Sequence, residues 1–343
     1  MTSPTQAPTV EADDPGPGST SLSKDEAGKG EQSLSPGQLM WRRFKRDRTG
    51  VISAFVVIAF FVIAALAPVI SMLYGKDPYT LYGTRVDPTL LDSFGYPAGP
   101  NGGMSGEFWF GIEPVLGRDV FTQLIYGMRT SLYTAIACTI PMVLMGVLVG
   151  LVGGYFGGKV DYWLGRVTDF MMALPAQLTL IATMPVVIAF FVSPTEETPV
   201  YIQFTATVVV LWLLGWMGMA RLVRSSALTL REREFVEAAK VSGASPWRII
   251  RKELLPNLLT PVLVQATYML PAAILTVAFL SFIGVGYIEP TPDWGRMFAS
   301  AANVYQYDPT YMFFPGIAMV IFVVAFNLLG DSVRDAFDPK SGR

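Results

Sequence analysis

The chain has 343 residues, of which 52% are hydrophobic and only 15% are charged. Soluble domains carry about 25% charged residues. With a mean hydropathy of +0.43, this composition excludes an ordinary cytosolic enzyme. The formal net charge is −2, so no overall basic field attracts nucleic acid. The chain has no histidine and one cysteine, Cys138, which excludes histidine-based metal sites, histidine-dependent catalytic triads and an internal disulfide.

The first part of the chain divides into a polar tail and a basic segment. Residues 1–35 consist almost entirely of small, polar and charged residues, which predicts a disordered cytoplasmic tail. The segment 36–49 contains a short basic stretch with interleaved aromatic residues at 41–48, directly before a long apolar run. This position favours an interfacial helix that meets anionic lipid headgroups over a nucleic-acid contact. A membrane domain is predicted over 50–340.

Six apolar runs approach or exceed the roughly 20 residues that a helix needs to cross the hydrocarbon core. They cover 51–73, 132–152, 164–191, 204–223, 258–283 and 311–329. The sequence therefore predicts an all-α membrane protein with six transmembrane helices. The first run is too long, and lies too far from the N-terminus, to be a cleaved signal peptide.

The positions of Lys and Arg predict the orientation. Of the 25 Lys and Arg residues, 20 fall in segments on one side of the predicted spans and 5 on the other. Because positive charge accumulates on the cytoplasmic side, we expect both termini in the cytoplasm. The loop 74–131 is then external, and the loop 221–257 is cytoplasmic.

The loop 221–257 has the local pattern of two helices joined by a turn. Gly243 suits the left-handed residue that ends a helix, Ser245 suits an N-cap, and Pro246 suits the first helical position. Ala238 and Ala239 would give the first helix a thin face for close docking. Composition alone leaves an amphipathic connector along the membrane surface as the alternative.

The same loop resembles the EAA signature of permease subunits of ATP-binding-cassette importers. That signature is Glu-Ala-Ala, three residues, Gly, nine residues, an aliphatic residue, one residue and Leu-Pro. The sequence has Glu-Ala-Ala at 237–239, then Gly243, and Leu-Pro at 255–256, and it departs at Glu253, which stands in the aliphatic position.

Other segments resemble one branch of this family, the C-type permease subunits of dipeptide, oligopeptide and nickel importers. The resemblance covers residues 116–132 before the second span, 153–169 after it, and 294–297 and 326–339 near the C-terminal end. It implies type I importer architecture with a cytoplasmic coupling helix, in a multi-pass protein of the inner or plasma membrane.

The resemblance also implies partners. We expect a second homologous permease subunit, two ATPase subunits that bind ATP and Mg²⁺, an extracytoplasmic substrate-binding protein and a di- or oligopeptide substrate. This chain itself is expected to carry no cofactor, no metal and no catalytic residues. It has no GxxxxGK[ST] loop to hold the phosphates of ATP, so hydrolysis falls to a partner.

This interpretation assigns two groups of site residues. The residues expected at the ATPase interface lie in the coupling loop and are Glu237, Ala238, Ala239, Lys240, Gly243, Ala244, Ser245 and Arg248. Three uncharged polar residues within the spans, Gln177, Gln265 and Asn327, are candidates for the translocation pathway, although such residues also form hydrogen bonds between helices.

The sequence leaves three alternatives open. The first is an importer of nickel or another small solute. The second is a stand-alone secondary transporter, which normally needs ionisable residues within the membrane; Arg166, Asp169 and Asp331 lie only near span ends. The third is a membrane-embedded enzyme, for which the sequence offers neither a nucleophile–base pair nor a metal-ligand set.

Overall fold

The computed structural model describes residues 36–193, 196 and 198–337. The predicted tail 1–35 lies outside the described residues, as does the end of the predicted membrane domain beyond residue 337.

By its internal contacts the chain divides into two units, residues 1–39 and residues 40–343. The described part of the first unit is only residues 36–39. All the candidate site residues lie in the second unit.

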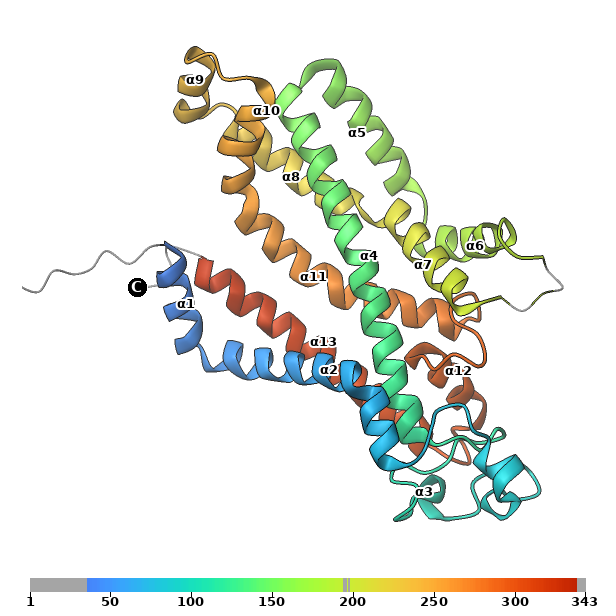
Figure 1. Cartoon of the computed structure of the whole chain (residues 1–343). Coiled ribbons are helices and arrows are strands. Elements are labelled where there is room, and N and C mark those ends of the chain that lie inside the picture. Colours follow the sequence, from blue (N-terminus) through green and yellow to red (C-terminus); the bar gives the residue numbers. More distant parts are fainter. Residues whose placement is uncertain (1–35, 194–195, 197, 338–343) are drawn as a thin grey trace, which may run out of the picture. The chain divides into compact units, whose positions relative to one another are not determined.

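Helices dominate the described residues (Figure 1). They are α1 (Pro36–Arg46), α2 (Arg48–Tyr74), α3 (Pro100–Gly103), α4 (Val120–Phe156), α5 (Gly158–Ala173), α6 (Ala176–Ala189), α7 (Val200–Gly215), α8 (Met217–Leu230), α9 (Glu234–Val241), α10 (Pro246–Ile249), α11 (Leu255–Phe282), α12 (Trp294–Val304) and α13 (Thr310–Phe337), with short π or 3₁₀ turns η1 (Tyr82–Val86), η2 (Pro88–Leu90) and η3 (Ile250–Leu254).

Long apolar helices confirm the predicted all-α membrane fold. Within the described residues five stretches are long and apolar enough to cross a membrane, namely Arg48–Tyr74, Val120–Phe156, Val200–Leu230, Pro246–Phe282 and Thr310–Phe337. The bent pair α5 and α6 raises this number to six if it counts as one span. Continuous runs of apolar residues were sufficient to find these helices, because the hydrocarbon core requires apolar side chains over the whole crossing.

The third predicted span, 164–191, is not one continuous helix. α5 and α6 meet at an angle of 90°. Pro175 lacks a backbone N–H, and a residue that precedes proline is driven towards extended backbone. Leu174 accordingly has φ −73° and ψ 134°, and the helix ends there.

Both long predicted loops are partly helical in the structure, so the true loops are shorter than predicted. Asp119 caps α4 by accepting a hydrogen bond from the Thr122 N–H at 2.7 Å, so residues 120–131, which the sequence placed in the loop 74–131, are helical. The connection between α2 and α4 is therefore the segment 75–119. Most of the predicted loop 221–257 is also helical.

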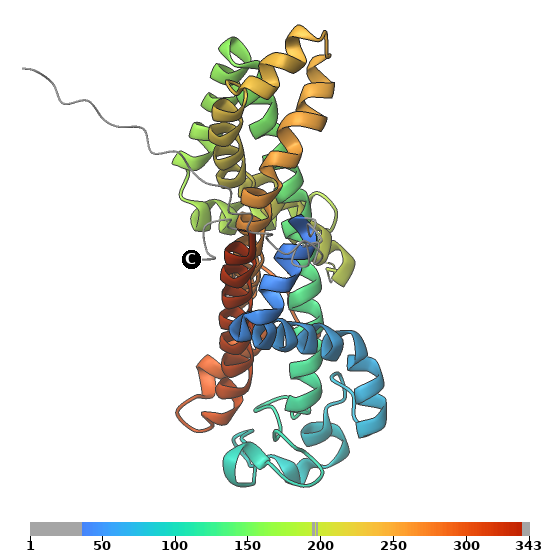
Figure 2. The ribbon, with the colours of Figure 1, turned by 90° about the vertical axis from the view of Figure 1, so that its left-hand side faces the viewer.

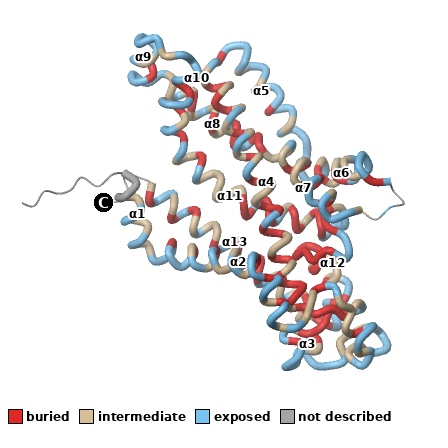
Figure 3. The backbone as a smooth tube through the Cα atoms, in the orientation of Figure 1, coloured by how far each residue is buried: buried red, intermediate tan, exposed pale blue. Residues whose placement is uncertain are grey.

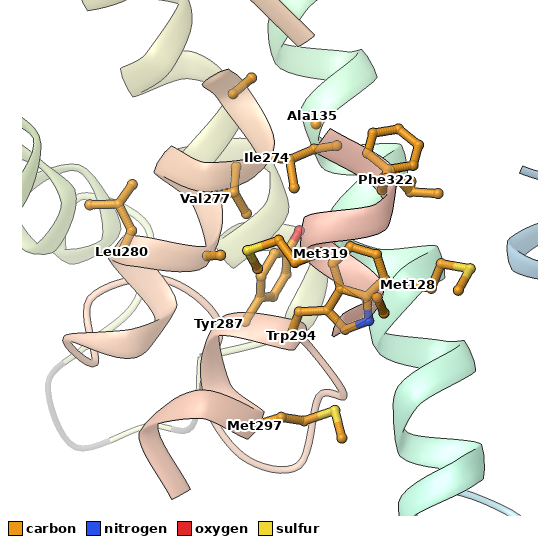
Figure 4. Packing of buried hydrophobic residues seen from close by; sticks show 14 of the residues in the cluster. Met128, Ala135, Ile274, Val277, Leu280, Tyr287, Trp294, Met297, Met319 and Phe322 are labelled. Atoms are coloured by element: carbon orange, nitrogen blue, oxygen red, sulfur yellow. The ribbon is translucent and has the colours of Figure 1, made fainter. Parts of the chain in front are cut away.

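The largest apolar core lies where α4, α11, α12 and α13 meet around Trp294. The Trp294 side chain is fully buried, and its Nε1–H donates to the Leu124 carbonyl at 3.1 Å. Figure 4 shows it beside Met128, Met319 and Tyr287. Figure 3 shows that buried residues concentrate here, whereas α5 and α9 are largely exposed.

Helix α4 connects the two ends of this unit. Figures 1 and 2 show that it runs from the segment 75–119 at one end to α5, α9 and α10 at the other. Its 37 residues correspond to about 55 Å of helix. A displacement of α4 at one end can therefore reach the other.

Candidate functional site

The short helix α9 carries the Glu-Ala-Ala sequence and ends as predicted. Gly243 has φ +75°, a left-handed conformation that favours glycine. Its N–H donates to the Lys240 carbonyl at 3.0 Å, and the Ala244 N–H donates to the Ala239 carbonyl at 3.0 Å. These two bonds satisfy the last carbonyls of α9 and turn the chain sharply.

The second helix of the predicted pair begins as expected but does not stand alone. Ser245 holds the N-cap position in extended backbone and Pro246 is the first helical residue, but the Ser245 side chain makes no capping hydrogen bond, contrary to the expectation for a serine N-cap. α10 continues through the π turn η3 into α11, so Pro246–Phe282 forms one stretch of 37 residues. The turn after α9 is therefore attached directly to a membrane helix.

The inner face of α9 packs on this long helix. Val236 is fully buried in a cluster with Ile249, Ile250 and Leu254. Ala239 and Ala244 pack, partly buried, against the same cluster. Of the two alanines of the predicted docking face, Ala239 faces the chain's own core and Ala238 is exposed.

The outer face of α9 and α10 is polar, apart from two exposed apolar side chains. Glu237, Lys240, Ser245 and Arg248 are all exposed. Val241 is 90% exposed and Trp247 is 61% exposed. Val241 and Trp247 are not among the predicted interface residues, although apolar residues between charged ones in a predicted docking loop are a usable signal. Together these residues form a surface suited to another protein.

Helix α8, which leads into α9, is packed tightly on α4. Gly146, Gly150 and Gly154 occupy every fourth position of α4, on the side that faces α8. A Cβ on any of the three would lie 2.5–2.7 Å from a Cβ of α8, closer than real Cβ contacts. Small residues at this spacing let the backbones of two membrane helices approach closely. α4 and α8 are therefore held as one unit.

Ion pairs join α8 to α5 as well. The Arg224 guanidinium forms a two-pronged ion pair with Asp161, with Nη2–Oδ2 at 2.7 Å. Arg221 contacts Asp169 at 2.9 Å, with both side chains more than half exposed. A pocket of about 450 Å³ is lined by these four charged residues and by Arg166. Helix α8, which leads into α9, is thus held by close packing on α4 and by ion pairs to α5.

The three pathway candidates do not come together in one pocket. Gln177 is exposed on α6, whereas Gln265 on α11 and Asn327 on α13 are half-buried. Gln177 lines a pocket of about 260 Å³ to which neither Gln265 nor Asn327 contributes.

A buried ion cluster lies at the opposite end of α4. Arg118 is 2% exposed and contacts Glu113 through Nη2–Oε1 at 3.0 Å and Glu289 through Nη1–Oε2 at 2.6 Å. Glu289 also pairs with Arg296, and the Tyr311 hydroxyl donates to Glu113 at 2.8 Å. Burial lowers the pKa of Arg296, and the negative charge of the nearby Glu113 partly offsets this lowering. The cluster fastens the segment 75–119 to α12 and α13.

In the sequence, Arg118 and Arg296 stand out only as parts of family-like segments, and their ion-pair partners are not predicted. Among the described residues there is no group of His, Cys, Asp and Glu that could hold a metal ion.

Comparison with known proteins agrees with this geometry. The family model described as "Binding-protein-dependent transport system inner membrane component" matches residues 142–343, and "N-terminal TM domain of oligopeptide transport permease C" matches residues 35–92. The fold resembles the inward-facing MetNI methionine ABC transporter with a TM-score of 0.52 at 20% identity, over 68% of this chain and 100% of that chain.

Two curated relatives cover nearly the whole sequence. The dipeptide transport system permease protein DppC of Bacillus subtilis (strain 168) is 35% identical over 312 residues, 91% of this chain and 88% of that protein. The nickel transport system permease protein NikC of Escherichia coli (strain K12) is 34% identical over 284 residues, 83% of this chain and 94% of that protein.

The fold and these matches define a membrane-spanning permease subunit of a binding-protein-dependent importer, a transport subunit and not an enzyme. The chain belongs to the family of C-type permeases of ATP-binding-cassette importers for dipeptides, oligopeptides and nickel. Membership implies a multi-pass protein of the inner membrane that works with another permease, ATPase subunits and a binding protein.

Proposed function

We propose that this chain forms half of the translocation pathway of an ATP-driven importer of di- or oligopeptides and receives the motion of an ATPase subunit through α9 and α10. The observation that carries this proposal is the exposed outer face of α9, whose inner face is fixed to a membrane helix through Val236. A surface that is free on one side and rigidly attached on the other is what a coupling contact requires.

The coupling contact is assigned to the eight loop residues expected from the sequence, in two roles. Glu237, Ala238, Lys240, Ser245 and Arg248 are exposed, so they are available to touch the ATPase subunit. Gly243 sets the turn, and Ala239 and Ala244 support α9 from inside. ATP and Mg²⁺ belong to two ATPase partners.

Peptides are the proposed substrate class for two reasons. Relatives that carry dipeptide or oligopeptide names cover about nine-tenths of this chain. The chain has no histidine, whose imidazole suits nickel, and its single cysteine is buried, so it lacks the imidazole and accessible thiolate ligands that would hold nickel along a pathway. The nickel permease relative keeps a nickel chelate as the second candidate.

We assign both termini and the α9–α10 loop to the cytoplasm. The excess of Lys and Arg in these segments supports this orientation. In α1, Lys45 lies 5.2 Å from the centre of the Trp41 ring, and basic residues fill the last turn. Such a helix suits the headgroup region, with aromatic rings at the interface and cations near lipid phosphates.

The partners proposed are a second homologous permease, two ATPase subunits and an extracytoplasmic binding protein. Native mass spectrometry of the protein, purified in mild detergent from its own membranes, tests this assembly. We expect one copy of this chain with one second permease and two ATPase subunits, and peptide in the binding protein recovered with them. A chain that arrives alone or as a homo-oligomer, under every nucleotide condition, would contradict the proposal.

A further inference from the structure

The break between α5 and α6 places irregular backbone deep in a predicted span. The predicted span begins at residue 164, so the break at Leu174 lies about 15 Å along it, near the middle of the roughly 30 Å hydrocarbon core. Residues 172–178, on both sides of the break, are all exposed on this chain. Non-helical backbone at such depth is tolerated only when it is buried in protein or lines a water-filled cavity, and never when it faces lipid.

A pocket of about 260 Å³ opens beside this break. Four helices contribute to it: Gln177 and Leu180 come from α6, Met269 and Thr276 from α11, Met142 from α4, and Gly215 from the end of α7. No charged side chain lines it. The walls are apolar, and the two methionines can adapt to differently shaped groups because their side chains are unbranched and flexible.

Two polar side chains face this pocket, and one has no partner. The Thr276 hydroxyl donates to the Ala272 carbonyl at 2.8 Å and keeps its acceptor lone pairs free. Across the described residues the Gln177 carboxamide has no hydrogen-bond partner, although it is exposed and lies within the predicted span 164–191. Leaving an amide unsatisfied in an apolar medium is costly. Gln177 therefore requires water or a polar ligand.

We propose that the break at Leu174–Pro175 and its pocket form a substrate subsite of the translocation pathway, in which Gln177 and Thr276 hydrogen-bond to the amide groups of a passing peptide. This inference rests on the proposed import function and assigns the substrate chemistry of that pathway. A carboxamide offers both donors and acceptors, as a peptide group does. Since no charge lines the pocket, the subsite accepts peptides whatever the charge of their side chains.

Single-cysteine accessibility tests the water-filled subsite. The one native cysteine, Cys138, is fully buried, so it contributes little background. Gln177→Cys and Thr276→Cys are made in the complete importer, reconstituted in vesicles, and treated with a charged methanethiosulfonate. Ile58→Cys on α2, where the native side chain is 60% exposed, is the matched control for an exposed apolar position.

We expect both pocket cysteines to react roughly tenfold faster than Ile58→Cys, because a charged reagent is excluded from lipid. Saturating peptide with its binding protein should slow these reactions. Rates no faster than that of Ile58→Cys in every nucleotide state would overturn the inference, and so would fast reactions that peptide never slows. Wild-type peptide uptake is measured first in the same vesicles, since its absence would contradict the proposed function and not the subsite.

A charge substitution tests the recognition chemistry. Gln177→Glu should reduce uptake of acidic tripeptides roughly tenfold relative to basic ones, because like charges repel in a narrow path. Gln177→Leu should lower the uptake of acidic, neutral and basic tripeptides alike. Assembly with the partner subunits confirms that each variant folds. An unchanged acidic-to-basic uptake ratio in an assembled Gln177→Glu importer would overturn the assignment.

Discussion

Gly150 of α4 lies against Val223 of α8, so closely that a Cβ built on Gly150 would be 2.7 Å from the Cβ of Val223. α8 leads through a short turn to α9, and α4 runs to the opposite end of the unit (Figure 1). This contact therefore ties the proposed coupling surface to the 37-residue helix α4. Because the two helices are so close at Gly150, even the methyl group of alanine would have no room there.

We predict that Gly150→Ala destabilises the folded protein by about 1–3 kcal/mol, the usual cost of overpacking. The matched control is Gly218→Ala on α8, where a Cβ meets nothing within 4 Å. The control should be close to neutral, because Gly218 is the second residue of α8 and the added Cβ meets no atom. Thermal unfolding of the purified protein in detergent measures both. Equal effects of the two substitutions would contradict the tight α4–α8 contact.

The turn after α9 gives a second prediction. Gly243 has φ +75°, and a Cβ there would meet nothing within 4 Å, so a substitution acts through backbone strain alone. Gly243→Val should cost about 1–2 kcal/mol locally and reduce peptide import per ATP hydrolysed, whereas Gly243→Asn should be better tolerated.

Gly284 is the matched control for this backbone effect. It has φ +80°, with nothing within 4 Å, and follows α11 at the end remote from α9. Gly284→Val should carry a similar strain and leave the ratio of import to hydrolysis unchanged. If both variants lose coupling equally, the turn at Gly243 has no special role.

The buried ion cluster gives a third prediction. Arg118→Met leaves the 1% exposed Glu113 without its guanidinium and should destabilise the protein by about 3–5 kcal/mol. Glu289→Gln should cost less, because the Glu289 side chain is 49% exposed and water can take over. Thermal unfolding in detergent ranks the two.

A double substitution checks the pairing itself. Arg118→Met combined with Glu113→Gln should recover part of the stability that Arg118→Met loses, because the unpaired buried charge is gone. Strictly additive losses would show that Arg118 and Glu113 do not stabilise one another.

The sequence predicted most of the fold because its main signal, a long apolar run, is local. It did not predict the break at Leu174, because the run 164–191 stays mostly apolar on both sides of Pro175 and proline is tolerated in membrane helices when neighbouring groups satisfy the freed backbone. The turn at Gly243 could be predicted, because a glycine that ends a helix in the left-handed conformation is determined by the residues next to it in the sequence.

The candidate site was predictable in position and less so in orientation. The spacing of Glu237, Gly243 and Leu255 located the loop, but the inward packing of Ala239 depends on α10 continuing into α11. The pairing of Arg118 with Glu289 joins residues 171 positions apart. No local pattern can reveal such a contact without the fold.

Charge reversal at Glu237 tests the central claim most directly. Glu237 is exposed, so Glu237→Arg should leave folding and membrane insertion intact. Glu232→Arg, the same change at an exposed position in the turn before α9, is the control. The measurement is peptide imported per ATP hydrolysed by the complete importer in vesicles. We predict a roughly tenfold loss for Glu237→Arg and a near-normal ratio for Glu232→Arg, because only Glu237 lies on the proposed contact. A Glu237→Arg importer that assembles and imports peptide at the wild-type ratio would contradict the account.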